Sequence, residues 1–144
     1  MSLVTLKEQI KSKLDLIDNI QQVEDYPTID FNGYPSAVVR SMGVDNDYET
    51  TCENLETYRF EIYLVIENSG DLYNLSKTRG AVEELFDEVR DNFDNDEFLS
   101  GLSLPSDRQL LGVLPALGEI HEVEEGKYVE AVIILNIRVS KSLS

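Results

Sequence analysis

The chain has 144 residues, a length that fits one domain with a substantial hydrophobic core. Its 28 acidic residues against 12 lysines and arginines give a formal net charge of −16, which disfavours binding to phosphate backbones and to anionic membranes. The first residues are amphipathic and charged rather than a signal peptide, no stretch is apolar enough to cross a bilayer, and the single cysteine, Cys52, excludes an internal disulfide. We therefore expect one cytoplasmic domain over residues 1–144.

An amphipathic helix is predicted from Leu3 to about Ile20, because apolar residues recur there at three- and four-residue spacings. Pro27 then forces the chain out of a helix. Residues 21–34 are predicted to form an irregular connection, in which residues 28–31 fit a short strand and Asn32-Gly33 fits a turn.

Residues 34–42 (YPSAVVRSM) predict a strand that Gly43 closes. Pro35 places the start of this strand at an edge, since proline cannot donate to a ladder. The acidic segment 44–56 (VDNDYETTCENLE) is predicted to be a loop, which would make an unusually long hairpin connection. Such a loop would be flexible in the free protein or ordered by a partner.

Residues 57–67 (TYRFEIYLVIE) give the clearest signal in the chain. Tyr58, Phe60, Ile62, Leu64 and Ile66 alternate with more polar residues, and this period of two predicts a long strand with one buried face. At about 3.3 Å per residue the strand would cross the whole domain. Its other face presents the candidate subunit-contact residues, which are Arg59, Glu61, Tyr63 and Val65.

A second amphipathic helix is predicted from about residue 76 to residue 93, with Gly80 and Ala81 allowing a close approach to the sheet. In residues 110–118 apolar residues are interrupted by Gly112, Pro115 and Gly118, which predicts short strands or irregular packing. Residues 119–124 (EIHEVE) alternate as a strand does, and a turn follows at 125–127.

The segment 128–139 (YVEAVIILNIRV) is apolar on both faces in its middle, which is typical of a central strand. We expect it to pair antiparallel with residues 57–67. Together the segments predict an α+β fold, an antiparallel or mixed β-sheet with two amphipathic helices packed on one face.

Residues that could carry a reaction are sparse. His121 is the only histidine and fits an exposed strand position better than a general base, and Cys52 lies in an acidic stretch that disfavours its thiolate. Acidic residues gather in two segments, but the spacing from Asp91 fails the EF-hand pattern. The sequence predicts no enzyme, no metal site and no cofactor.

The order of parts over nearly the whole chain resembles the tail-terminator and tail-completion proteins of long-tailed phages and prophages. The pieces that carry the resemblance are FNGYPSAVV (residues 31–39), the acidic segment after it, YRFEIYLVIE (58–67), TRGAVEELFDEVRDNF (78–93) and YVEAVIILNIRV (128–139). The turn into a strand at FNGYP is the most distinctive of them.

The resemblance implies a non-enzymatic subunit without a cofactor, assembled in the host cytoplasm into a homohexameric ring. The ring would cap the head-proximal end of the tail tube, stop tube polymerisation, contact the tail tube protein and a head-completion protein, and stay in the virion tail. DNA would pass through its lumen without specific binding, and no membrane would be involved. Residues expected to line that lumen or meet a partner are Asp45, Asp47, Glu49, Asp94, Asp96 and Glu97.

Two alternatives remain at this point. One is another head-tail connector or a tail tube component, for which the same class of fold is expected. The other is a small bacterial regulatory or ligand-binding α+β domain that dimerises through its sheet. Stoichiometry separates them, because a closed dimer, a single ring and a polymerising cylinder are different assemblies.

Overall fold

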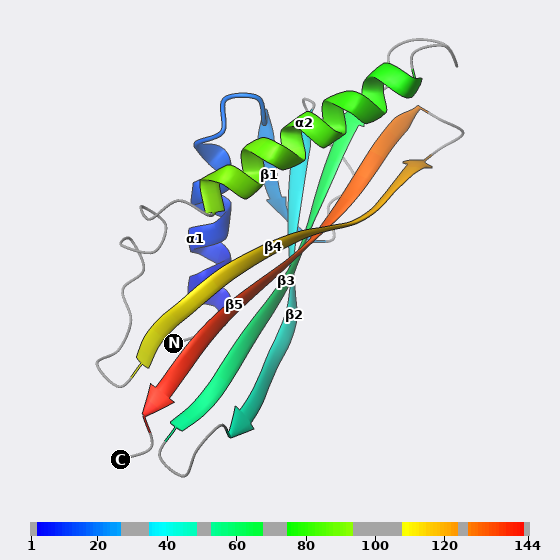
Figure 1. Cartoon of the computed structure of the whole chain (residues 1–144). Helices are drawn as coiled ribbons and strands as arrows, with labels where there is room; N and C mark the ends of the chain where they lie inside the picture. The colour runs from blue at the N-terminus through cyan, green and yellow to red at the C-terminus, as the bar shows by residue number, and fades with distance from the viewer. Residues whose placement is uncertain are drawn as a thin grey trace.

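The protein forms a five-stranded sheet with two helices, as seen in a computed structural model (Figure 1). The structure describes residues 3–26, 35–48, 53–67, 75–93, 108–123 and 127–142. In chain order the elements are α1 (Leu3–Asp15), β1 (Gln22–Asp25), β2 (Ser36–Tyr48), β3 (Glu53–Glu67), α2 (Leu75–Phe93), β4 (Arg108–Val123) and β5 (Tyr128–Ser142).

The strands lie in the order β1-β2-β3-β5-β4. β1 pairs with β2 in parallel, and every other pair is antiparallel. β3 and β5 are paired along their full lengths, with Ile62 opposite Ile133, which confirms the predicted central pairing. The α+β class with a mixed sheet is likewise confirmed.

The hydrophobic core lies between the helices and one face of the sheet, called here the inner face. Alternate residues of β5 from Val129 to Val139 are fully buried on this face, and so are Phe60, Ile62 and Leu64 of β3. α1 packs on β1 and β2, while α2 runs obliquely over β3, β4 and β5 (Figure 1). Each large apolar side chain buried in this way contributes about 1.5–3 kcal/mol.

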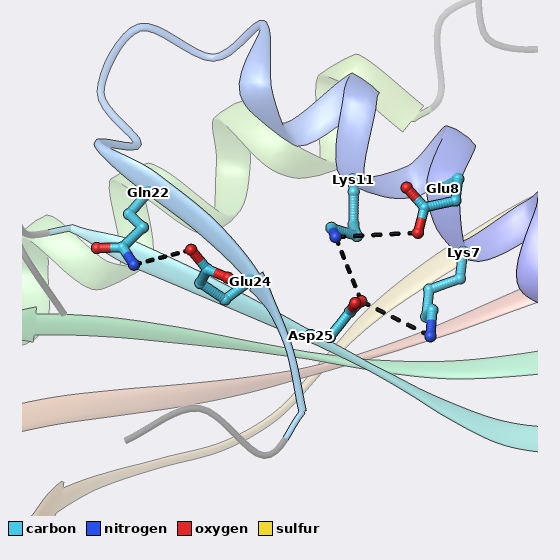
Figure 2. Close-up of polar contacts among 6 residues, drawn as sticks. All are labelled: Lys7, Glu8, Lys11, Gln22, Glu24 and Asp25. Carbon is cyan, nitrogen blue, oxygen red and sulfur yellow. Dashed lines mark hydrogen bonds and ion pairs between the residues drawn. The ribbon is translucent and has the colours of Figure 1, made fainter. Parts of the chain in front are cut away.

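α1 is held to the sheet by apolar packing and by charge. Leu6, Ile10 and Leu14 are buried in the core. On the same helix, Lys7 Nζ and Lys11 Nζ lie 3.6 and 3.4 Å from Asp25 Oδ1 of β1, and Figure 2 shows the Asp25 carboxylate between the two lysines.

The predicted end of the first helix near Ile20 was wrong, since α1 ends at Asp15. The chain then turns through bonds from the Leu16, Ile17 and Ile20 amides to carbonyls three residues earlier, which satisfies acceptors left open at the helix end. Ile17 and Ile20 remain buried, so the apolar spacing reflected core contacts that continue past the helix.

β1 was not predicted. It is a four-residue strand that joins the sheet edge through its parallel pairing with residues 36–39 of β2. The strand expected at residues 28–31 and the turn at Asn32-Gly33 lie outside the described residues. Parallel pairing of so short a segment depends on tertiary context, and the period of two needs a longer run to be visible.

The acidic segment 44–56 is mostly strand, which corrects the predicted loop. β2 continues through Gly43 to Tyr48, and β3 begins at Glu53, so only residues 49–52 separate the two strands. Gly43 does not close the strand but sits at a register shift with φ of 126°, a conformation that a glycine adopts without a Cβ clash.

β4 also corrects the prediction of short or irregular pieces. It runs unbroken from Arg108 to Val123 and absorbs its irregularity in two register shifts, between Leu110 and Gly112 and between Leu117 and Ile120. As an edge strand it tolerates Pro115, which lacks an amide donor.

α2 buries the predicted stripe of Val82, Leu85, Phe86, Val89 and Phe93. The expected close approach at Gly80 and Ala81 was wrong. A Cβ on Gly80 would meet nothing within 4 Å, and Ala81 is exposed.

An ion pair ties the far end of the sheet together. Arg108 Nε of β4 donates to Glu56 Oε1 of β3 at 2.9 Å and thus reaches across β5, and both side chains are largely buried. Burial and the neighbouring Glu56 raise the pKa of Tyr58 beside this pair. Removing one partner of such a pair leaves a buried charge uncompensated.

Candidate assembly surface

The face of the sheet opposite the helices, called here the outer face, carries the side chains that alternate with the core residues. On β3 these are Arg59, Glu61, Tyr63 and Val65, the four predicted as a subunit contact. Val65 is only 9% exposed, and Ser36 and Val38 beside it on β2 are buried as well. The accessible part of the outer face therefore lies around Tyr63 and beyond it toward β4.

Four side chains form what we call the tyrosine cluster: Tyr26, Arg40, Glu61 and Tyr63. The Tyr26 and Tyr63 rings stack with centroids 5.8 Å apart, and the Arg40 guanidinium lies 4.7 Å from the Tyr26 ring centroid. Tyr63 Oη donates to Glu61 Oε2 at 2.5 Å. Cation–π and stacking contacts of this kind fix the side chains and present a preorganised aromatic surface.

Electrostatics in the tyrosine cluster favour a neutral phenol beside a charged guanidinium. Burial raises the pKa of Tyr63, and its hydrogen bond to Glu61 raises that pKa further. Hydrogen bonding with Tyr63 raises the pKa of Arg40. Both shifts favour the arrangement seen, in which the Tyr63 phenol keeps its proton and the Arg40 guanidinium stays charged.

An apolar strip adjoins the tyrosine cluster and consists of Leu114, Ala116, Val132 and Ile134. Ile134 lies directly opposite Glu61 on one side and Ala116 on the other, and Val132 lies opposite Tyr63. Leu114 is 52% and Ile134 42% exposed. Exposed apolar side chains that adjoin one another and are rimmed by polar groups are typical of protein contact sites.

Polar groups border the strip at both ends. Arg59 Nη2 pairs with Asp45 Oδ2 at 2.5 Å, and His121 Nε2 lies 3.1 Å from Glu130 Oε1. Between Arg59 and Leu114 lies Asn136, whose side-chain oxygen is shielded from solvent and receives no hydrogen bond from the described residues. Buried acceptors are normally satisfied, so the Asn136 oxygen is an exception at this border of the strip.

Of the six acidic residues predicted to line a lumen or meet a partner, two lie on β2 and four lie outside the described residues. Asp45 lies on β2 and faces Arg59, so a neighbouring cation offsets its charge. Asp47 is also in β2, opposite Leu55, but its side chain is outside the described part. Glu49, Asp94, Asp96 and Glu97 lie outside the described residues.

Sequence reasoning found Glu61 and Tyr63 but missed Tyr26, Arg40 and Leu114. The apolar middle of residues 128–139 on both faces did signal Val132 and Ile134. Leu114 was hidden by Gly112 and Pro115, which suggested irregular structure. Tyr26 reaches Tyr63 because β1 pairs with β2, a contact that no local pattern encodes.

Two kinds of site are absent from the described ranges, which are a metal-binding cluster and a membrane-spanning helix. Nowhere in them do three histidine, cysteine or acidic side chains come together in a way that could hold a metal ion. Within the same ranges, neither helix has the length and apolar character that crossing a membrane requires.

Comparison with known proteins identifies a fold. No family model matches the chain, and no curated protein matches it in sequence. The fold is similar to that of a chain in the solved virion of a native gene transfer agent (GTA) particle, with a TM-score of 0.59 and 15% sequence identity. The match covers 94% of this chain and 94% of that chain, so the resemblance extends over the whole architecture.

Proposed function

We propose that this protein is a structural subunit of a phage-type virion, and more specifically a tail terminator that forms a ring on the head-proximal end of the tail tube. The observation that carries the proposal is the fold shared end to end with a chain of a GTA virion. The order of sequence segments over the chain, which resembles tail terminators, supports the finer role. In this role the protein is not an enzyme and needs no cofactor.

The outer face supports an assembly role on physical grounds. Ring formation requires a heterologous contact, in which one surface of a subunit meets a different surface of its neighbour. The apolar strip would supply desolvation energy, and the rigid tyrosine cluster beside it would supply orientation. Its partners in the proposed assembly are a second copy of the chain, the tail tube protein and a head-completion protein.

Native mass spectrometry over a rising concentration series tests the ring directly. We expect a six-subunit species to grow with concentration, either alone or on addition of tail tube protein. A dimer that persists at every dilution would contradict the terminator and favour a regulatory domain. Long cylinders visible by electron microscopy would instead identify a tube protein.

A matched pair of variants assigns the contact. We expect Leu114→Ser to weaken the assembly, because it removes exposed apolar surface from the strip. Val4→Ser is the control, since Val4 is 64% exposed and belongs to α1, on the helical side of the sheet rather than on the outer face. Equal losses in both variants would mean that the strip is not the contact.

A further inference from the structure

A pocket of about 350 Å³ opens on the helical side of the molecule, away from the outer face. α2 forms one wall, the turn after α1 forms another, and Ile66 near the end of β3 lies at its base. The Gln21 amide donates to the Pro35 carbonyl at 2.8 Å, which fixes the backbone of the second wall. The volume falls at the lower end of the range for ligand pockets, which is about 300–1,000 Å³.

The pocket carries negative charge that is not balanced by any cation among the described lining residues. Glu84 and Glu88 line it one helical turn apart, an arrangement in which like charges on one helix face repel. Asn19 Nδ2 donates to Glu88 Oε1 at 2.6 Å, so one oxygen of that carboxylate already has a partner. Among the described residues that line the pocket there is no lysine, arginine or histidine.

The arginines of α2 are directed elsewhere. Arg79 pairs with Glu122 of β4 at 3.4 Å, and Arg90 pairs with Asp87 one turn away at 3.1 Å. The helix therefore places the two carboxylates of Glu84 and Glu88 at a cavity, while its two arginines pair with other acids. A local conflict of this kind is expected where a site awaits a ligand.

Beside the two carboxylates the pocket has an apolar surface. Leu85 is almost fully buried and Ile66 is half-buried, and both line the cavity. Ala81 adds a small side chain to the same wall, which leaves the carboxylates accessible. A ligand that fits must combine an aliphatic stem with a cationic end, which is how an arginine side chain is built.

We infer that this pocket receives an arginine side chain from a partner protein, with the guanidinium between Glu84 and Glu88 and the methylene stem on Leu85 and Ile66. Arginine is favoured over a metal ion because it matches carboxylates with paired donors and satisfies the apolar surface as well. The inference rests on the proposed assembly role only in naming a protein as the source of the arginine. It adds a second contact, on the side of the molecule opposite to the apolar strip.

A titration with Nα-acetyl-arginine amide, followed by two-dimensional amide NMR of the full chain, tests this site. We expect saturable shifts for the amides of Asn19, Ala81 and Leu85. The isosteric neutral probe Nα-acetyl-citrulline amide should cause none of them. The double variant Glu84→Gln with Glu88→Gln should bind the arginine probe about tenfold or more weakly, as expected for the loss of charge-assisted hydrogen bonds.

Glu83→Gln is the matched control, because Glu83 is an exposed glutamate of the same helix that does not line the pocket. Absence of saturable shifts, equal binding of citrulline, or an equal loss in Glu83→Gln would each overturn the inference. Because the probe is a small molecule, this result is independent of ring formation. A persistent dimer would overturn the terminator role and leave the arginine pocket to be judged by its own titration.

Discussion

Phe60 and Glu61 are neighbours in β3, yet they belong to two different environments. Phe60 points to the inner face and is fully buried under the helices. Glu61 points to the outer face and accepts a hydrogen bond from Tyr63 Oη. The same division continues into β5, where Ile133 is fully buried and Ile134 is 42% exposed. The inner face carries the core, whereas the outer face is buried around Val65 and remains accessible toward β4, where it can make contacts.

The largest expected difference between the faces is in core packing. Phe60→Ala should lower the free energy of unfolding by about 3–5 kcal/mol, because it removes a buried ring and leaves a cavity. Ile134→Ala should change it by about 0.5 kcal/mol or less, as for an exposed surface site. Urea unfolding at low protein concentration measures both changes in free energy. The dependence of the unfolding free energy on urea concentration should be the same for the unmodified protein and both variants, which checks that the values can be compared.

If Ile134→Ala costs as much as Phe60→Ala at low concentration, the two faces are not different in the isolated chain. If that cost arises only at high concentration, Ile134 is buried by assembly. The second outcome would sharpen the comparison, because it would identify the outer face as an interface.

A smaller difference between the faces is expected in how much unfolding free energy each loses at high pH. Burial raises the pKa of Tyr58 on the inner face and of Tyr63 on the outer face. A tyrosine in the unfolded chain ionises near pH 10, so the stabilisation is complete below that pH and is lost as the pH rises through the higher folded values. Unfolding free energies measured from about pH 8 upward should therefore fall above about pH 10.

Tyr58→Phe and Tyr63→Phe should each make that fall shallower, and Tyr58→Phe should have the larger effect since Tyr58 is only 3% exposed. Urea unfolding followed by circular dichroism at each pH gives the unfolding free energies, and their decrease with pH is compared among the variants. A fall that is unchanged in both variants would show that neither phenol is responsible. A larger effect from Tyr63→Phe than from Tyr58→Phe would contradict the expectation that the tyrosine of the inner face dominates the loss of stability at high pH.

The smallest effect is expected for the exposed ion pair of the outer face. Arg59 and Asp45 both have side chains more than half exposed, so solvent screens their attraction. A double-mutant cycle with Arg59→Ala and Asp45→Ala should give a coupling of about 0.2–1 kcal/mol that decreases with added salt. Coupling that is larger and insensitive to salt would mean that this part of the outer face is shielded from water.

The centre of the fold was predictable from sequence because its signals are local. β3 and β5 alternate apolar and polar residues over long runs, and α2 repeats its apolar residues at helical spacing, so each pattern reports its own buried face. The edges were less predictable. At Gly43 and around Gly112 and Pro115 the sequence resembles a break, but the sheet accommodates these residues as bulges or at an edge.

The candidate site was predictable only in part, for a related reason. Glu61 and Tyr63 could be identified because the alternation of β3 places them opposite the core. Their surroundings depend on partners that are distant in sequence, as when β1 brings Tyr26 to Tyr63 and β4 brings Ala116 to Ile134. The pocket at Glu84 and Glu88 likewise joins α2 to the turn after α1, and no spacing along the chain reveals that juxtaposition.

The position of β5 has a consequence for folding. β5 is the last strand in chain order, but it lies between β3 and β4 and pairs with both along most of its length. During synthesis, the edge of β3 that pairs with β5 therefore stays unpaired until β5 has left the ribosome. Pairing between segments so distant in the chain slows folding, and in the meantime the unpaired backbone N–H and C=O groups of β3 are open to other nascent chains.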